Sequence, residues 1–155
     1  MLLRITKQIH YPRNLWIRKI IPIFYIISLQ LVTGIPNPEQ LEKLYAFEIA
    51  INLSAEIYNY PFWLQDLSHL PLFFLLTWFS FWIICKRRAD CTKPWNLKVM
   101  LFSISYAIFN ELIQSLIPDR FPSLGDLIMN LGGVLAALII YRFTCRLKYF
   151  DENKC

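Results

Sequence analysis

Four long apolar stretches run through the sequence, separated by polar connections. They cover residues 20–35, Leu67–Cys85, Val99–Pro118 and about Phe121–Tyr141. A helix needs about 20 predominantly apolar residues to cross the hydrocarbon core of a bilayer, and each stretch is close to that length. Only the last two contain an acidic residue, one in each. The pattern predicts an all-α integral membrane protein with four transmembrane helices.

Residues 36–66 form the only long connection and hold five acidic residues and one lysine. Asn37 and Pro38 are typical of a helix start, because proline is tolerated at the first helical position. Apolar residues then recur at near-helical spacing, which predicts a helix in the outer membrane interface. An irregular loop is the alternative over part of this segment. A fifth span is disfavoured, because it would bury Glu48 and Glu56 in hydrocarbon.

Basic residues alternate between the two sides of the predicted spans. Five Lys or Arg precede the first stretch, one follows it, five lie between the second and third, one precedes the fourth, and four come after it. Cytoplasmic segments of membrane proteins are enriched in Lys and Arg. The alternation therefore predicts that both termini are cytoplasmic, with a basic arm over residues 1–19 and a tail over residues 149–155.

Composition agrees with this interpretation. Of the 155 residues, 56% are hydrophobic and only 17% are charged, whereas soluble domains carry about 25% charged residues. The net charge of +5 indicates contact with anionic lipid headgroups and not with nucleic acid, because the basic residues form short clusters beside apolar stretches. The lipid bilayer is the expected partner, and the sequence leaves an oligomer or a second membrane protein open.

The first stretch shares a basic lead-in and an apolar run with signal peptides. A cleavage site of small residues is not evident before Pro36, so the sequence favours a retained membrane anchor. Four cysteines fall at or beyond predicted cytoplasmic ends, and their spacing is unlike that of zinc ligands. They are Cys85, Cys91, Cys145 and Cys155. We expect neither a metal nor a cofactor.

Seven polar or ionisable side chains are predicted to lie in the outer third of the bundle. They are Asp66, His69, Glu111, Gln114, Arg120, Asp126 and Asn130. Spacings of three or four residues place pairs on one helix face, and the directions of the spans place the pairs at similar depth. An ionisable group in hydrocarbon costs ~2.5–3.5 kcal/mol on insertion scales, so such groups face the bundle interior. The pattern predicts a small polar pocket open to the outer leaflet.

Two adjacent glycines, Gly132 and Gly133, follow these residues in the fourth stretch. Small residues let helix backbones approach each other closely in membranes. We therefore expect a tight helix–helix contact at this position.

The order and spacing of the polar residues resemble the VanZ-like family of small multi-pass membrane proteins. The matching segments are Asp66-Leu-Ser-His69, Glu111-Leu-Ile-Gln114, Pro118-Asp-Arg120, Asp126 and Asn130-Leu-Gly132-Gly133. The resemblance covers roughly Asp66 to Ile140, and residues 67–148 are the predicted VanZ-like core of three spans. Leu67 stands where the family often has lysine, so a paired charge is not expected there. The resemblance implies a bacterial cytoplasmic membrane protein of the cell envelope, and some members are associated with low-level teicoplanin resistance.

Three residues of the predicted pocket are candidate acid–base groups. Glu111 is suited to act as a general acid or base, because a carboxyl group in an apolar bundle is held partly away from water. His69 could shuttle a proton near neutral pH, with Asp66 orienting its ring. Whether the protein is an enzyme stays open at this point.

The other residues are candidate binding groups. Arg120 would hold an anionic group, such as a phosphate of a lipid or a lipid-linked precursor, through its planar set of donors. A lipid headgroup, a lipid-linked precursor and a glycopeptide are all compatible ligands. Further binding contacts would come from Gln114, Asp126 and Asn130.

Two other interpretations remain. In the first, the polar residues only hold helices in register, with Arg120 paired to Asp126 or Glu111 and Gln114 bonded to Asn130. In the second, an oligomer forms a transport path. The second is disfavoured, because no ionisable residue lies in the inner half of any predicted span and a path normally has polar groups at several depths.

Overall fold

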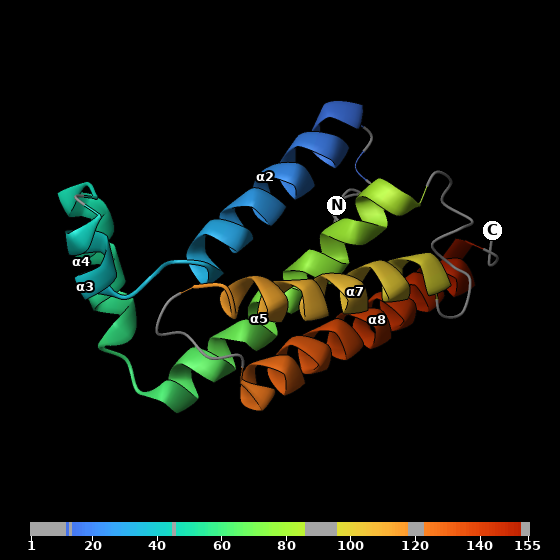
Figure 1. The fold of residues 1–155 in the computed structure, drawn as a ribbon. Helices are drawn as coiled ribbons and strands as arrows, with labels where there is room; N and C mark the ends of the chain where they lie inside the picture. The colour runs from blue at the N-terminus through green and yellow to red at the C-terminus, as the bar shows by residue number, and fades with distance from the viewer. Residues whose placement is uncertain (1–11, 13, 45, 86–95, 118–122, 153–155) are drawn as a thin grey trace.

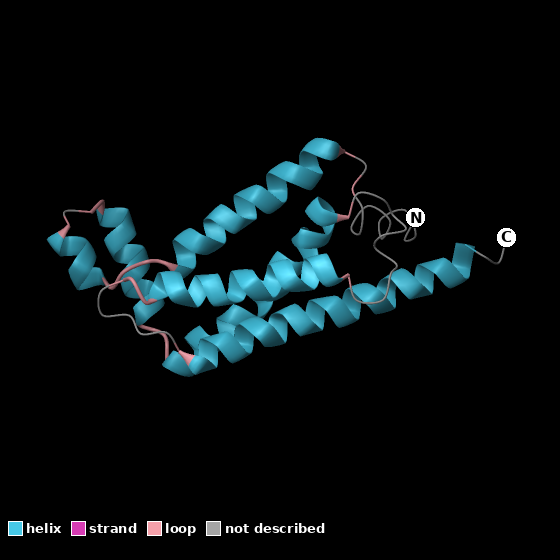
Figure 2. Cartoon of the chain, turned by 45° about the vertical axis from the view of Figure 1, so that its right-hand side comes forward, coloured by secondary structure: helices cyan, strands magenta, loops and turns pink. Residues whose placement is uncertain are grey.

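The computed structural model describes residues 12, 14–44, 46–85, 96–117 and 123–152. Within these ranges it contains six helices and no strand (Figures 1 and 2). The helices are α2 (Leu15–Thr33), α3 (Pro38–Lys43), α4 (Glu48–Tyr58), α5 (Phe62–Ile84), α7 (Leu97–Gln114) and α8 (Leu124–Glu152). The predicted all-α fold is confirmed.

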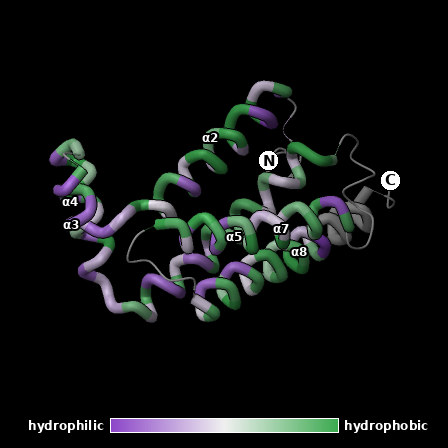
Figure 3. Tube along the Cα trace, viewed as in Figure 1, coloured by the Kyte–Doolittle hydropathy of each residue, from purple (hydrophilic) through white to green (hydrophobic). Residues whose placement is uncertain are grey.

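Three helices are long and apolar enough to cross a membrane: α2, α5 and the Leu124–Thr144 part of α8. Figure 3 shows hydrophobic residues along these helices, whereas hydrophilic residues are frequent in α3 and α4. Helix α7 corresponds to the third predicted span and has 18 residues. Its buried face carries polar side chains, including Asn110 and Gln114, which lower its hydropathy. The chain is thus an all-helical protein with at least three helices of membrane-spanning character.

Helix α5 begins earlier than the sequence predicts. The apolar stretch predicts a span from Leu67, whereas the helix starts at Phe62, directly after Pro61. Asp66 is therefore inside the helix, near its start. Its carboxylate lies against Gly125 in the first turn of α8, where the partial positive charge of that helix start stabilises an anion.

The long connection folds into two short helices, where the sequence predicts one. Helix α3 starts as expected: Asn37 caps it by accepting a hydrogen bond from the amide of Gln40 (2.9 Å), and Pro38 is its first residue. The chain leaves the helix after Lys43 and enters α4 at Glu48. The two helices lie together beyond one end of the bundle, the end where α2 and α7 finish (Figure 1).

Helices α5 and α8 form the central pair of the bundle and run in the same direction. Residues that meet across the contact rise in number together, first Leu70 with Gly133 and later Trp78 with Tyr141. The ring of Tyr141 also stacks on Phe81, with ring centroids 3.7 Å apart. This parallel contact places the starts of both helices, and their polar residues, at the same end of the bundle.

Helix α7 runs antiparallel to this pair and lies beside it in both views (Figures 1 and 2). Helix α2 packs against α5 and also contacts α7. The hydroxyl of Tyr25 donates a hydrogen bond to the carbonyl of Leu72 (2.7 Å), and the Tyr25 ring packs edge-on against Phe79. The four long helices therefore surround a core of Phe73, Leu76, Val99, Ala107, Val134 and Leu138.

Arg18 joins the start of α2 to the end of α5. Its guanidinium donates hydrogen bonds to the carbonyl of Trp82 (3.0 and 3.2 Å) and to the carbonyl of Cys85 (2.7 Å). The last carbonyls of a helix have no donor within the helix, so they need a partner from outside it. Arg18 supplies this partner and holds the two helix ends together.

We predict that Arg18→Ala destabilises the protein, because it removes charged donors from partly buried carbonyls. The expected loss is about 1.5–3 kcal/mol, the range for hydrogen bonds to charged groups. Unfolding in mild detergent, followed by tryptophan fluorescence, measures it. Lys19→Ala is the matched control, since Lys19 is the neighbouring basic residue and is exposed. Equal destabilisation by both variants would contradict the clamping role of Arg18.

Candidate functional site

His69 and Asn130 connect α5 to α8 at the end where both helices begin. Nδ1 of His69 lies 3.0 Å from Oδ1 of Asn130, and both side chains are buried. The position follows from the parallel packing, because His69 and Asn130 each lie about two turns from the start of their helices. The sequence placed these residues at one depth, and the hydrogen bond shows that they also face each other.

Glu111 connects a third helix, α7, to this pair. The amide nitrogen of Asn130 donates a hydrogen bond to Oε1 of Glu111 (2.8 Å), and Glu111 is only 7% exposed. An amide group donates through nitrogen and accepts through oxygen, so this bond leaves the carbonyl oxygen of Asn130 to accept from His69. The chain His69–Asn130–Glu111 therefore fixes the ring with its proton on Nδ1.

Asp126 approaches the other nitrogen of the same ring. Its Oδ1 lies 3.7 Å from Nε2 of His69, and Asp126 is 9% exposed. With Nδ1 protonated, a neutral ring would turn its Nε2 lone pair toward a carboxylate oxygen, which is repulsive. A proton on Nε2, or on Asp126, removes the repulsion. The pair is thus suited to hold an additional proton and to deliver it to a bound ligand.

Asp66 does not orient His69 as the sequence suggested. Among the described residues it makes no hydrogen bond or ion pair with the ring. A Cβ built on Gly125 would lie 2.7 Å from Oδ2 of Asp66, so the carboxylate sits against the first turn of α8. The backbone N–H groups and the dipole of that helix start attract an anion. Asp126 and Asn130 occupy the place beside His69 instead.

Gln114 is completely buried, but it does not bond to Asn130 as the structural interpretation expected. Both of its amide atoms lack a hydrogen-bond partner among the residues the structure describes. The reason is geometric: Asn130 already uses its oxygen toward His69 and its nitrogen toward Glu111. Gln114 lies one turn beyond these contacts, at the end of α7.

A second polar cluster, which the sequence did not indicate, joins α2 to α7. The hydroxyl of Thr33 lies 2.7 Å from Oδ1 of Asn110, and both residues are buried. Tyr106 bonds to Oε1 of Gln30 one turn further along (3.1 Å). The signal was the spacing of Ser103, Asn110 and Gln114, which puts polar side chains on one face of α7.

The remaining predicted residues have different outcomes. Arg120 lies outside the described residues. Gly133 meets α5 closely: an added Cβ would lie 2.3 Å from the carbonyl oxygen of Leu70 and 2.9 Å from the amide of Phe74. Gly132 has room for a Cβ, with Leu70 Cδ1 at 3.9 Å. Within the described ranges, no group of three His, Cys, Asp or Glu side chains is arranged to hold a metal ion.

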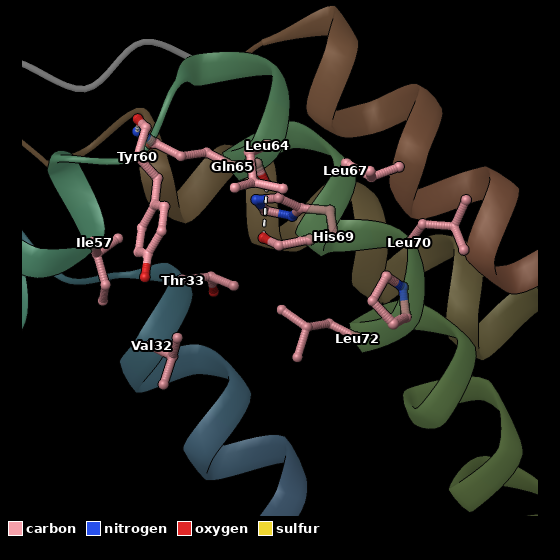
Figure 4. Close-up of a pocket in the computed structure, with 12 residues that line it drawn as sticks. Val32, Thr33, Ile57, Tyr60, Leu64, Gln65, Leu67, His69, Leu70 and Leu72 are labelled. Atoms are coloured by element: carbon pink, nitrogen blue, oxygen red, sulfur yellow. Dashed lines mark hydrogen bonds between the residues drawn. The ribbon is translucent and has the colours of Figure 1, made fainter.

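A pocket of about 520 Å³ lies beside His69 (Figure 4). Small-molecule sites typically have volumes of about 300–1,000 Å³. The ends of α2 and α4 form one side of the pocket, with Thr33, Ile57 and Tyr60, and the start of α5 forms the other, with His69 and Leu72. The sequence did not indicate this pocket, because Ile57 and Tyr60 come from the long connection, and their position opposite the start of α5 is a tertiary feature without a local signal.

Comparison with protein-family models matches residues 22–146 to a family described as VanZ/LLP1. The match covers well over half of the chain and includes every site residue that the sequence predicts. It agrees with the resemblance carried by the order of the polar motifs. No match was found among curated proteins or among solved structures.

Proposed function

Because the chain belongs to the VanZ/LLP1 family, we propose that it binds or modifies a component of the bacterial cell envelope at a polar site near the outer face of the cytoplasmic membrane. One observation carries the proposal: His69, Asn130 and Glu111 come from three helices and form one hydrogen-bonded chain beside a pocket. Scaffolding alone would not require a histidine and two acids at one buried position, since burial of charge is costly.

Four membrane crossings are part of the proposal. Helix α7 has 18 residues and is therefore about 27 Å long at 1.5 Å per residue, close to the thickness of the hydrocarbon core. It packs against both α5 and α8, so its polar side chains need not face lipid. With four crossings, both termini are cytoplasmic and α3 and α4 lie at the outer interface, in agreement with the distribution of basic residues.

Cysteine labelling tests this topology in a variant whose four native cysteines are replaced by serine. Ile49 is 82% exposed on α4, and Leu97 is 58% exposed at the start of α7. We expect Ile49→Cys to react with a membrane-impermeant maleimide in intact cells. Leu97→Cys should react only after the membrane is permeabilised. Leu116 follows α7 and is 77% exposed, so Leu116→Cys should also react in intact cells. Protection of Leu116→Cys in intact cells, or labelling of Leu97→Cys there, would contradict the four-span topology.

In the proposed mechanism each site residue has a different role. Asn130 holds both neighbours in place, the His69–Asp126 pair supplies a proton, and Glu111 acts as the acid or base at the buried end of the hydrogen-bonded chain. Arg120 is proposed to bind an anionic group of the ligand, such as phosphate or carboxylate. Gln114 has amide groups left to orient it. Lipid headgroups, lipid-linked precursors and teicoplanin-type glycopeptides all carry groups of this chemistry.

The test compares Glu111→Gln and His69→Gln with Ser103→Ala. The two glutamine variants keep polar atoms but cannot exchange a proton at neutral pH, while Ser103 is buried on α7 away from the site. Each variant is expressed in a teicoplanin-susceptible host, and lipid that co-purifies is identified by mass spectrometry. We expect the site variants to lose the resistance phenotype and to retain roughly tenfold less ligand, the effect of losing about 1.4 kcal/mol. Folded site variants with unchanged phenotype and lipid would overturn the proposal.

The structural interpretation is the second candidate, and the contact of Thr33 with Asn110 favours it. That contact joins α2 to α7 with neutral groups alone, as expected for helix bracing, for which interhelical bonds contribute ~0.6 kcal/mol on average. If bracing is the whole role of the site, loss of function and loss of folded protein will coincide in every variant. A transporter formed by an oligomer is the third candidate, and the deeper polar residues Thr77 and Ser80 do not favour it, because their hydroxyls bond to their own helix.

A further inference from the structure

We propose that the site takes its ligand from the bilayer: a lipid places one hydrocarbon chain in the pocket between α2, α4 and α5, and its polar end lies against His69. The inference rests on the proposed function and names the class of ligand, an amphiphile with a long chain. An acyl chain and an isoprenoid chain share this chemistry.

The pocket wall is mainly apolar. Seven of its twelve lining residues have purely hydrocarbon side chains: Val32, Ile57, Leu64, Leu67, Leu70, Pro71 and Leu72. Two of the polar ones are bonded to nearby backbone: Ser68 donates to the carbonyl of Gln65 (2.6 Å), and the Gln65 amide donates to the carbonyl of Tyr60 (2.7 Å). Water gains few hydrogen bonds in such a space, whereas a hydrocarbon chain is well solvated by it.

The pocket is continuous with surface that a membrane would cover. Val32 and Leu67 line it and are also 46% and 44% exposed. Leu31, next to Val32 on the spanning helix α2, is 67% exposed. Apolar side chains this exposed on a spanning helix face lipid, so a chain from the outer leaflet can enter without crossing water. This continuity makes a lipid chain the expected occupant, and not a water-soluble molecule.

At the start of α5, one edge of the pocket carries His69 and the backbone carbonyl of Leu67. His69 is on the wall, and through Asn130 it joins the buried chain that ends at Glu111. Pro71, also on the wall, has no N–H, so it cannot donate the helical hydrogen bond to the carbonyl of Leu67. That carbonyl can therefore accept from a hydroxyl or amine of the ligand. A lipid held by its chain would bring its first polar groups to this edge.

Photo-crosslinking in nanodiscs tests the inference. One probe is a phospholipid with a diazirine in its acyl chain, and the other is an isoprenyl phosphate with a diazirine in its chain. Mass spectrometry compares labelling of residues 64–72 with labelling of the lipid-facing side of α8, where Leu135 is 51% exposed. We expect labelling of residues 64–72 to exceed that of α8 for at least one probe, and the stronger probe identifies the chain type. Equal labelling of both regions by both probes would overturn the inference.

Blocking variants make the test specific. Leu72→Trp fills the pocket from α5, and Ile57→Trp fills it from α4 without altering α5. The matched control is Leu75→Trp, because Leu75 is on α5 outside the pocket and is 40% exposed. We expect either blocking variant to lower pocket labelling on the order of tenfold, as for removal of a central contact, while the control has no effect. Unchanged labelling in both folded blocking variants would contradict occupancy by a chain.

The outcomes separate this inference from the proposed function. Absent pocket labelling, together with loss of phenotype in Glu111→Gln, would overturn the lipid chain and leave the proposed function standing. Strong pocket labelling that the blocking variants remove, together with an unchanged phenotype in Glu111→Gln and His69→Gln, would support the lipid pocket and overturn the proposed function.

Discussion

Asn130→Leu is expected to abolish function while leaving a folded, less stable protein. The leucine side chain has similar size, but it can neither accept from His69 nor donate to Glu111. Each buried group that loses its partner costs about 1–3 kcal/mol. The ring is then no longer held in one orientation, so ligand retention should fall by roughly a hundredfold, the equivalent of ~2.8 kcal/mol. Co-purified lipid and teicoplanin susceptibility measure the functional effect, and denaturation in detergent measures stability.

Asn110→Leu is the matched control for this experiment. Asn110 is as fully buried as Asn130 and also takes part in an interhelical contact, but that contact is with Thr33 of the pocket wall and is not part of the His69–Asn130–Glu111 chain. We expect it to lose stability and to keep function. If both variants lose function in proportion to their loss of stability, the hydrogen-bonded chain serves only to brace the helices.

Gly133→Ala should cause the largest loss of stability of any single methyl addition considered for this protein. Its new Cβ would lie 2.3 Å from the carbonyl oxygen of Leu70 and 2.9 Å from the amide nitrogen of Phe74. These are backbone atoms of α5, so they cannot move without displacing the helix. We expect a loss of about 3 kcal/mol, at the upper end of the usual cost of overpacking. Equilibrium unfolding in mild detergent gives the value.

Gly132→Ala provides the comparison on the adjacent residue. Its Cβ would lie 3.9 Å from Leu70 Cδ1, an ordinary contact. Alanine also favours a helix over glycine by about 0.5–1 kcal/mol, so stability should be unchanged or slightly higher. A similar loss in the two variants would mean that α5 and α8 do not meet at Gly133.

Much of the fold was predictable from local sequence. Continuous apolar runs indicate α2, α5 and α8, because a spanning helix must show hydrocarbon to lipid along its length. Asn37 and Pro38 mark the start of α3 by their own chemistry. The start of α5 at Phe62 was not predicted, because Asp66 interrupts the apolar run although a helix tolerates it there. The parallel contact of α5 with α8 is a tertiary feature without a local signal.

The sequence predicted how deep in the membrane the site residues lie, but not which of them are in contact. Span directions place His69, Glu111 and Asn130 at one level of the bundle, and the structure joins them by hydrogen bonds. Which side chains form hydrogen bonds depends on the rotation of each helix about its axis. In the structure this rotation pairs Asn130 with His69 and Glu111, and not with Gln114. The same rotation brings Asp126, not Asp66, to Nε2 of His69.

The shared direction of α5 and α8 has a consequence for changes of chain length. The packing of α5 against α8 fixes His69 and Asn130 relative to each other. Glu111 is on α7, so its position depends on how far along these two helices α7 packs. One residue removed from α7 between Ala107 and Glu111 would turn the carboxyl group by about 100° about the helix axis, since a turn has 3.6 residues. A single deletion inside α7 would therefore separate Glu111 from Asn130 and His69, even though the contact between α5 and α8 stayed intact.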